Sequence, residues 1–111
     1  MNDNSRSTQA LDRTFDALSS LHRRRVLLLL SDACPEVGDA PSLAELAPDH
    51  TDYRRYVTTM VHKHLPKLAE YDYVDWDSDE EVVRRGPCYG EVAVMLELLV
   101  DNRERLPGAF S

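Results

Sequence analysis

The sequence has few of the residues that stabilise small modules or carry catalysis. Only two cysteines, Cys34 and Cys88, occur in 111 residues, and they form no Cys-x-x-Cys pair. This excludes a disulfide framework and a structural zinc site. With four glycines there is no glycine-rich phosphate loop, and neither a His-Glu-x-x-His sequence nor a Ser/His/Asp pattern is present. We therefore expect no metal, no cofactor and no enzymatic activity.

Long apolar runs are also missing. The longest, Val26–Leu30, is far shorter than the ~20 residues that cross a bilayer. The N-terminus lacks the succession of basic, apolar and small residues that marks a signal peptide. These absences predict a cytoplasmic protein without a membrane partner.

Basic residues are outnumbered, and lysine is scarce. The chain has 20 Asp and Glu against 13 Lys and Arg, a net charge of −7, and its only lysines are Lys63 and Lys67. An acid-rich, lysine-poor composition is typical of halophilic archaea, where high salt screens the repulsion between surface carboxylates. The net charge therefore points to the salt of the cytoplasm and does not exclude an anionic partner.

Apolar residues at helical spacing predict a mainly helical chain. The helical period begins at Leu11, a second helix follows from about Leu21, and the run Val26–Leu30 predicts that this second helix lies at the centre of the domain. Residues 1–9 are polar and predict a disordered tail. One domain is expected to span residues 10–106.

A short helix and a long helix are predicted next. Ser42 and Glu45 match a capping box at the start of the short helix. The long helix is expected over residues 53–71, with a kink or a 3₁₀ adjustment at Pro66, which lacks a backbone donor. A helical wheel places the apolar side of the long helix on Tyr53, Val57, Met60, Val61, His64, Leu65 and Leu68.

A hairpin and a last helix complete the chain. Residues 73–76 and 82–85 are rich in β-formers, Gly86-Pro87 closes the hairpin, and a helix follows over residues 89–105. A short helix, a long helix and a hairpin in this order predict a winged helix-turn-helix, a mainly α fold with a β-hairpin wing.

Charge placement indicates where an anion would bind. No carboxylate occurs in the seventeen residues between Asp52 and Glu70, and a second window between Asp16 and Asp32 is also free of acids. Both windows are basic, which phosphate binding explains most simply. The alternative is that both are core helices whose basic side chains extend along the surface to reach water.

One segment carries a family resemblance. The sequence Val-His-Lys-His-Leu-Pro-Lys-Leu-Ala-Glu-Tyr-Asp-Tyr-Val at residues 61–74 resembles the recognition-helix segment of ArsR-like winged-helix regulators. Its His-Leu-Pro-Lys-Leu portion resembles a group of small haloarchaeal proteins, and Leu11 to Leu30 is similar to the first two helices of that group. The resemblance extends over residues 10–105. It implies a DNA-binding transcriptional regulator that recognises double-stranded DNA.

The wheel and the charge pattern suggest a role for each polar residue. The candidates for base contacts in the major groove, made by helix 53–71, are Arg55, Thr58, Thr59, His62 and Lys63. The candidates for contacts to the DNA backbone are Arg23, Arg24, Arg25, Arg54, Lys67, Arg84 and Arg85. For each residue the alternative is a solvated surface side chain, and the arginines at the start of a helix could instead pair with carboxylates.

Two further interactions are not expected: contact between the hairpin tip and DNA, and a metal ion shared by two histidines. Five carboxylates crowd the hairpin tip, which predicts that the tip does not touch DNA; they are Asp75, Asp77, Asp79, Glu80 and Glu81. His62 and His64 are two residues apart and point to different sides of a helix, so a shared metal ion is not expected.

The last helix predicts a homodimer. Its apolar stripe is larger than so small a domain is expected to cover, and it consists of Val92, Met95, Leu96, Leu99 and Val100. A two-fold dimer would place two recognition helices ~34 Å apart, one turn of DNA. Packing inside the monomer is the alternative. The alternative function is a winged-helix protein-interaction module that does not bind DNA, which the acidic tip favours.

Overall fold

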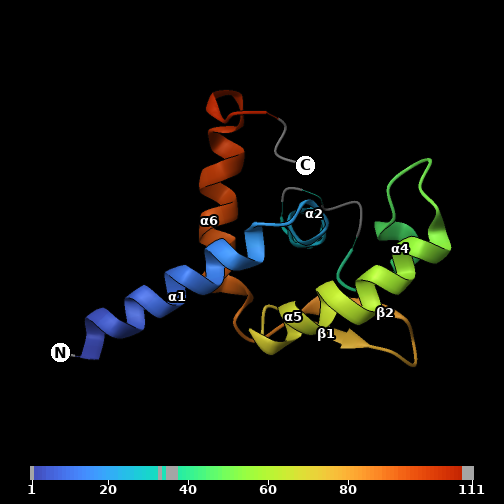
Figure 1. The fold of residues 1–111 in the computed structure, drawn as a ribbon, viewed down its shortest axis with the longest axis horizontal. Helices are drawn as coiled ribbons and strands as arrows, with labels where there is room; N and C mark the ends of the chain where they lie inside the picture. Colours follow the sequence, from blue (N-terminus) through green and yellow to red (C-terminus); the bar gives the residue numbers. More distant parts are fainter. Residues whose placement is uncertain (1, 33, 35–37, 109–111) are drawn as a thin grey trace.

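The structure is a computed structural model that describes residues 2–32, 34 and 38–108. It is mainly helical with one two-stranded antiparallel hairpin, an arrangement compatible with a winged helix (Figure 1). In chain order the elements are α1 (Asn2–Leu18), α2 (Leu21–Leu29), α3 (Leu43–Leu46), α4 (Tyr53–Thr59), the π-helical turn η2 (Met60–His64), α5 (Leu65–Glu70), β1 (Val74–Asp77), β2 (Val82–Arg85), α6 (Tyr89–Asp101) and the 3₁₀ turn η3 (Arg103–Arg105).

The two end helices differ from the prediction. Residues 2–9 are helical and belong to α1, so the prediction of a disordered tail is wrong for them; Met1 lies outside the described residues. The N-terminal part of α1 extends beyond the other elements (Figure 1). At the other end, α6 stops at Asp101, and a 3₁₀ turn replaces the predicted helix up to Arg105.

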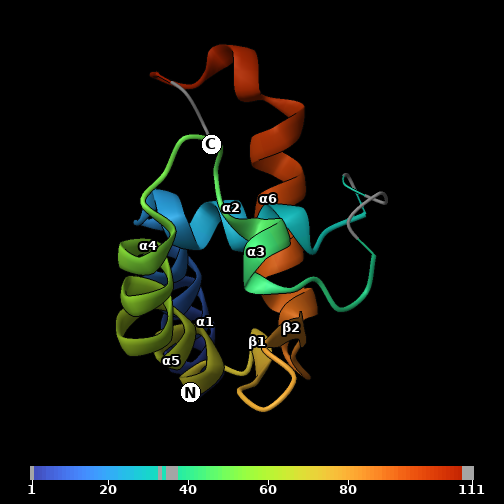
Figure 2. The ribbon, with the colours of Figure 1, turned by 90° about the vertical axis from the view of Figure 1, so that its right-hand side faces the viewer.

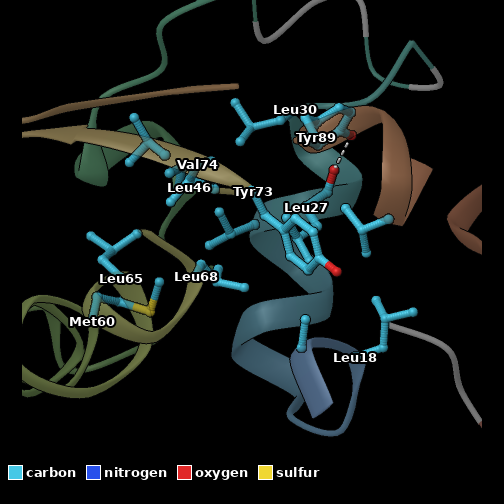
Figure 3. Packing of buried hydrophobic residues seen from close by; sticks show 14 of the residues in the cluster. Leu18, Leu27, Leu30, Leu46, Met60, Leu65, Leu68, Tyr73, Val74 and Tyr89 are labelled. Atoms are coloured by element: carbon cyan, nitrogen blue, oxygen red, sulfur yellow. Dashed lines mark hydrogen bonds between the residues drawn. The ribbon is translucent and has the colours of Figure 1, made fainter. Parts of the chain in front are cut away.

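Helix α2 lies at the centre, as its apolar run predicts. It contacts α1, α3, η2 and α6, and Figure 2 shows these elements around it. Val26 and Leu27 are fully buried. The hydroxyl of Tyr89, at the start of α6, donates to the carbonyl of Leu27 at 2.8 Å (Figure 3). This bond ties the last helix to the central one inside the core.

The long helix forms at the predicted place, in three continuous segments from Tyr53 to Glu70. The Asp52 carboxylate caps it by accepting from the amide of Arg55. Its middle turn is wider than an α-turn, since the amide of Leu65 bonds to the carbonyl of Met60. Of the two expected adjustments near Pro66, the 3₁₀ turn is therefore wrong, because the helix widens just before this proline; the kink stays a prediction.

The π-turn changes which residues face the core. Buried positions recur every four residues, at Tyr56, Met60, His64 and Leu68, and Leu65 is buried beside them. One additional residue in a wide turn makes the four-residue spacing possible. The predicted apolar arc misses Tyr56 and wrongly includes Tyr53, which is 46% exposed.

The capping box and the hairpin agree with the prediction. Ser42 and Glu45 exchange both capping-box bonds at the start of α3. In the hairpin, Val74 is opposite Arg85 and Asp77 is opposite Val82. A β-bridge from Ser42 to Val82 joins the hairpin to the segment before α3. The short helix, the long helix and the hairpin are thus held in one unit.

Candidate nucleic-acid interface

The residues predicted to touch bases lie on the outer side of the long helix. Arg55, Thr58, His62 and Lys63 are exposed, whereas Thr59 is half-buried. The guanidinium of Arg55, the imidazole of His62 and the ammonium of Lys63 have no hydrogen bond or ion pair with any residue that the structure describes. These side chains are therefore available to a ligand.

Buried side chains of the same helix set the orientation of that outer side. Met60, Leu65 and Leu68 are fully buried in the core, which fixes the rotation of the helix about its axis. The backbone is thus held by packing on one side while the polar side remains exposed.

Arg23 has a structural role and is not at the surface. Only 6% of it is exposed, and its guanidinium donates to the carbonyls of Ala17 and Asp16 and to the hydroxyl of Ser19. It also bonds to Nδ1 of His64 at 3.0 Å. The prediction that Arg23 contacts a DNA phosphate is corrected, because burying a charge requires the internal partners that Arg23 has.

His64 lies on the buried side, as the wheel predicts. It is 4% exposed, and its pKa is lowered to about 4 by burial first, and then by the charges of Arg23, His22 and Lys63. The imidazole is neutral at neutral pH, so it can accept the hydrogen bond from Arg23. This bond joins α2 to the long helix at its π-turn.

The other two arginines of α2 also bond to the backbone. Arg24 donates to the carbonyl of Leu18 at 2.8 Å, and Arg25 to that of Leu46 at 3.1 Å. Both residues are half-buried. Their first role is to bridge α2 to the end of α1 and to α3, and contacts to phosphates would compete with these bonds.

Lys67 is held by a carboxylate from the first helix. Its ammonium lies 2.8 Å from the Asp16 carboxylate, and the Tyr71 hydroxyl donates to the same oxygen at 2.5 Å. The pKa of Asp16 is lowered, mainly by the hydrogen bonds from Lys67 and Tyr71. The pKa of Lys67 is raised, mainly by its hydrogen bond to Asp16. Lys67 is therefore not a free cation.

The wing arginines are paired as well. Arg84 lies 3.9 Å from the carboxylate of Asp77 and 3.6 Å from that of Glu80. Arg85 bonds to Asp32 at 2.8 Å and to the carbonyl of Leu30 at 2.7 Å. Phosphate contacts by either arginine would have to replace these partners.

The cations thus divide into two groups. Those of α2, of the wing and at Lys67 have partners within the protein, as does Arg13, which pairs with Glu91 at 3.2 Å. Among the described residues the long helix carries three cations without such partners, and these are Arg54, Arg55 and Lys63. Near the C-terminus, Arg103 bonds to the carbonyl of Val100, and Arg105 is a further exposed arginine without a partner among the described residues. The largest group of free cations therefore lies on the helix that contains no carboxylate between Tyr53 and Ala69.

The hairpin tip uses one of its carboxylates to build its own turn. Asp77 accepts hydrogen bonds from the amides of Asp79 and Glu80. In addition Glu81 adopts a left-handed backbone, with φ of 58°. The tip is negative, and among the described residues only Arg84 forms ion pairs with these carboxylates.

Most of the residues predicted to form a dimer interface pack against the core of the monomer. Val92 and Leu96 are buried in its core, so the prediction that they contact a second copy is corrected. Met95 and Leu99 are partly buried against the core, and Val100 is half-buried. The exposed apolar residues of α6 are Val94, at 61%, and Leu98, at 52%.

The sequence pattern did not predict two features of the site: the pairing of Asp16 with Lys67, and the exposure of Val94 and Leu98. Asp16 lies 51 positions before Lys67 in the chain, and no local pattern indicates that they meet. Val94 and Leu98 have helical spacing four residues apart, but the wheel alone gave no reason to prefer them over Val92 and Leu96.

The described residues give no sign of a metal site or a membrane span. Within them, no group of three or more histidines, cysteines or carboxylates is placed to hold a metal ion. No helix in this part of the chain has the length and apolarity needed to cross a membrane.

The sequence matches a protein family. A family model described as "Domain of unknown function (DUF7344)" matches residues 15–84, from the end of α1 to the last residues of the hairpin. Neither the curated proteins nor the solved structures contain a match.

Proposed function

The chain belongs to the DUF7344 family, and we propose that it is a DNA-binding transcriptional regulator of the winged helix-turn-helix type. The long helix, residues 53–70, is the recognition helix, and α3 supports it. The observation that carries this proposal is the distribution of cations: the fold pairs those of α2 and the wing internally and leaves Arg54, Arg55 and Lys63 free on one helix.

The chemistry of that helix suits a duplex. Guanidinium and ammonium groups bind phosphates, and an arginine can pair with a guanine edge in the major groove. Thr58 and His62 add further hydrogen-bonding groups between the cations. In an acidic protein, a helix without carboxylates keeps the local potential favourable for an anion.

The wing plays a smaller part in this proposal than in most winged helices. Arg84 is paired with carboxylates, and the tip is acidic. A negative tip is repelled by phosphates. Contact with DNA is therefore made by the helix, and the wing tip stays away from the backbone.

We also propose that the regulator works as a homodimer. The interface is built on the exposed Val94 and Leu98 of α6, together with Leu11 and Phe15 of α1, which are 46% and 54% exposed. Helices α1 and α6 contact each other, so these residues come from neighbouring elements. A symmetric dimer supplies two recognition helices for a two-fold operator.

A salt titration of DNA binding tests the function. We expect the affinity for genomic DNA fragments to fall linearly with salt on logarithmic axes. Arg55→Ala should weaken binding about tenfold, since a good base contact contributes ~1–3 kcal/mol. Arg84→Ala is the matched control, because it removes the same charge from a paired arginine, and its effect should be much smaller. Equal losses of DNA affinity in the two variants, or an affinity that does not change with salt concentration, would contradict the recognition-helix proposal.

The second candidate is a protein-interaction module of the same fold. It is favoured by the acidic hairpin tip with Asp79, Glu80 and Glu81 exposed. In that case no fragment binds in a salt-dependent manner, and a protein partner binds in a fixed ratio that Glu80→Lys reduces while Arg55→Ala does not.

A further inference from the structure

A surface hollow lies beside the recognition helix, between α1, α2 and α5. Its volume is about 540 Å³, and it is lined by Arg23, His62, Lys63, Lys67 and two carboxylates, Asp16 and Glu70. Lys63 and His62 are exposed at its edge. The hollow therefore continues the free cationic surface of the helix towards α1.

One internal anion occupies the cationic part of this hollow. The carboxylate of Asp16 accepts from Lys67 at 2.8 Å and from Tyr71 at 2.5 Å. Both ends of the ion pair are partly open to solvent, since the Asp16 and Lys67 side chains are 39% and 37% exposed. An ion pair of this kind is weak enough for another anion to replace it.

Lys63 provides a direct comparison. It lines the same hollow and is four residues before Lys67 on the same helix. It forms no ion pair with any residue in the described part of the chain. The same helix thus presents one free lysine and one lysine that already has an anionic partner.

We propose that Asp16 competes with a DNA phosphate for Lys67, so that the hollow is a phosphate subsite whose occupant in the free protein is the protein's own carboxylate. The inference rests on the proposed function and identifies the residue that regulates it. DNA gains the Lys67 contact only where a phosphate displaces Asp16. In weak, non-specific complexes Lys67 stays paired with Asp16 and does not contact a phosphate. Asp16 therefore increases the difference in affinity between a specific DNA site and other DNA.

The first experiment compares two substitutions that change the net charge equally. Asp16→Asn removes the competing charge but keeps an oxygen that can accept from Lys67 and Tyr71. Asp12→Asn is the control, because Asp12 is exposed on the same helix, one turn earlier, and has no interaction partner among the described residues. Binding of genomic DNA fragments is measured by fluorescence anisotropy over a salt series.

Asp16→Asn should bind DNA more tightly than Asp12→Asn by about threefold, as expected for a surface ion pair. Its log-affinity against log-salt slope should become steeper by about 0.9 per protomer, because one more phosphate is neutralised. Equal affinities and equal slopes in the two variants would overturn the proposal.

A Lys67→Ala background shows whether Asp16 acts through Lys67. In that background Asp16→Asn and Asp12→Asn should have the same effect on affinity. A purely structural role of Asp16 would leave the difference between them unchanged, and that result overturns the proposal.

A last comparison leaves Asp16 intact, so it does not depend on the folding of the Asp16 variant. In the otherwise unchanged protein, Lys63→Ala should weaken DNA binding more than Lys67→Ala, because only Lys67 has to break an ion pair first. Equal losses, or a larger loss for Lys67→Ala, contradict the competition. Absence of DNA binding by the unchanged protein overturns the proposed function, whereas binding without any Asp16 effect overturns only this inference.

Discussion

Arg23 and His64 connect the central helix α2 to the long helix, residues 53–70, through one buried hydrogen bond. Arg23 satisfies its charge with three further acceptors in and after α1. His64 accepts because burial and the nearby Arg23 charge keep it neutral, with a pKa of about 4. A protonated imidazole could not accept this bond and would face a guanidinium.

The stability should therefore fall with acid in a window set by His64. The folded-state pKa of about 4 lies below the ordinary value of 6.5, so between these values the unfolded chain binds a proton that the folded chain does not. The free energy of unfolding is unaffected above pH 6.5, decreases as the pH falls towards 4, and loses about 3 kcal/mol at most from this group.

Chemical denaturation at a series of pH values measures this effect. His64→Gln removes the titrating group, so the free energy of unfolding of this variant should change less between pH 6.5 and pH 4. His62 is an exposed histidine on the same helix, so His62→Gln serves as the control and should retain the pH dependence of the unchanged protein. A dependence that is the same in all three proteins would show that His64 does not cause it.

At the scale of elements, the turn between the hairpin and α6 determines how these two parts meet. The amide of Gly86 bonds to the carbonyl of Tyr73, and the amide of Cys88 to that of Asp72. A Cβ at Gly86 would lie 2.4 Å from the Asp72 carbonyl oxygen and 2.9 Å from the Val74 amide nitrogen. Only glycine allows this close approach of two backbone segments.

Two glycines in this region give a matched pair of substitutions. Gly86→Ala should destabilise the protein by about 1–3 kcal/mol, because the added methyl group meets backbone atoms that cannot move independently. Gly90→Ala meets no atom within 4 Å and lies in α6, so it should be neutral or stabilise by up to about 1 kcal/mol. Thermal unfolding of the two variants measures the difference, and equal melting temperatures would contradict the crowding at Gly86.

At the scale of the molecule, the free cations of the long helix and the exposed apolar residues of α1 and α6 lie on different elements. Arg54, Arg55 and Lys63 lie on the long helix, whereas the most exposed apolar residue of α6 is Val94, at 61%. Figure 1 shows α1 and α6 extending from the body in directions away from α4 and α5. A dimer formed on α1 and α6 would therefore leave the long helices of both copies uncovered.

The dimer is tested by a substitution with a control of equal exposure. Leu98→Asp should give a monomer in sedimentation, and its DNA affinity should fall because the two half-sites are no longer joined. Leu21, at the start of α2, is also 52% exposed. Leu21→Asp should therefore sediment with the mass of the unchanged dimer. If the unchanged protein sediments as a monomer, the homodimer proposal is wrong.

The sequence by itself determined the type and order of the elements. The capping box of α3, the hairpin and the span of the long helix all follow from local preferences, because caps, turns and apolar spacing act within a few residues. It also determined the carboxylate-free helix, which remains the basis of the proposed function.

Only the tertiary structure decided which cations are free. Arg23 is as basic in the sequence as Arg55, but the fold buries Arg23 against His64 and leaves Arg55 at the surface. Lys67 and Asp16 meet only because α1 packs beside α5. Ion pairs and burial depend on contacts between residues far apart in the chain, so helical spacing and local charge cannot predict them.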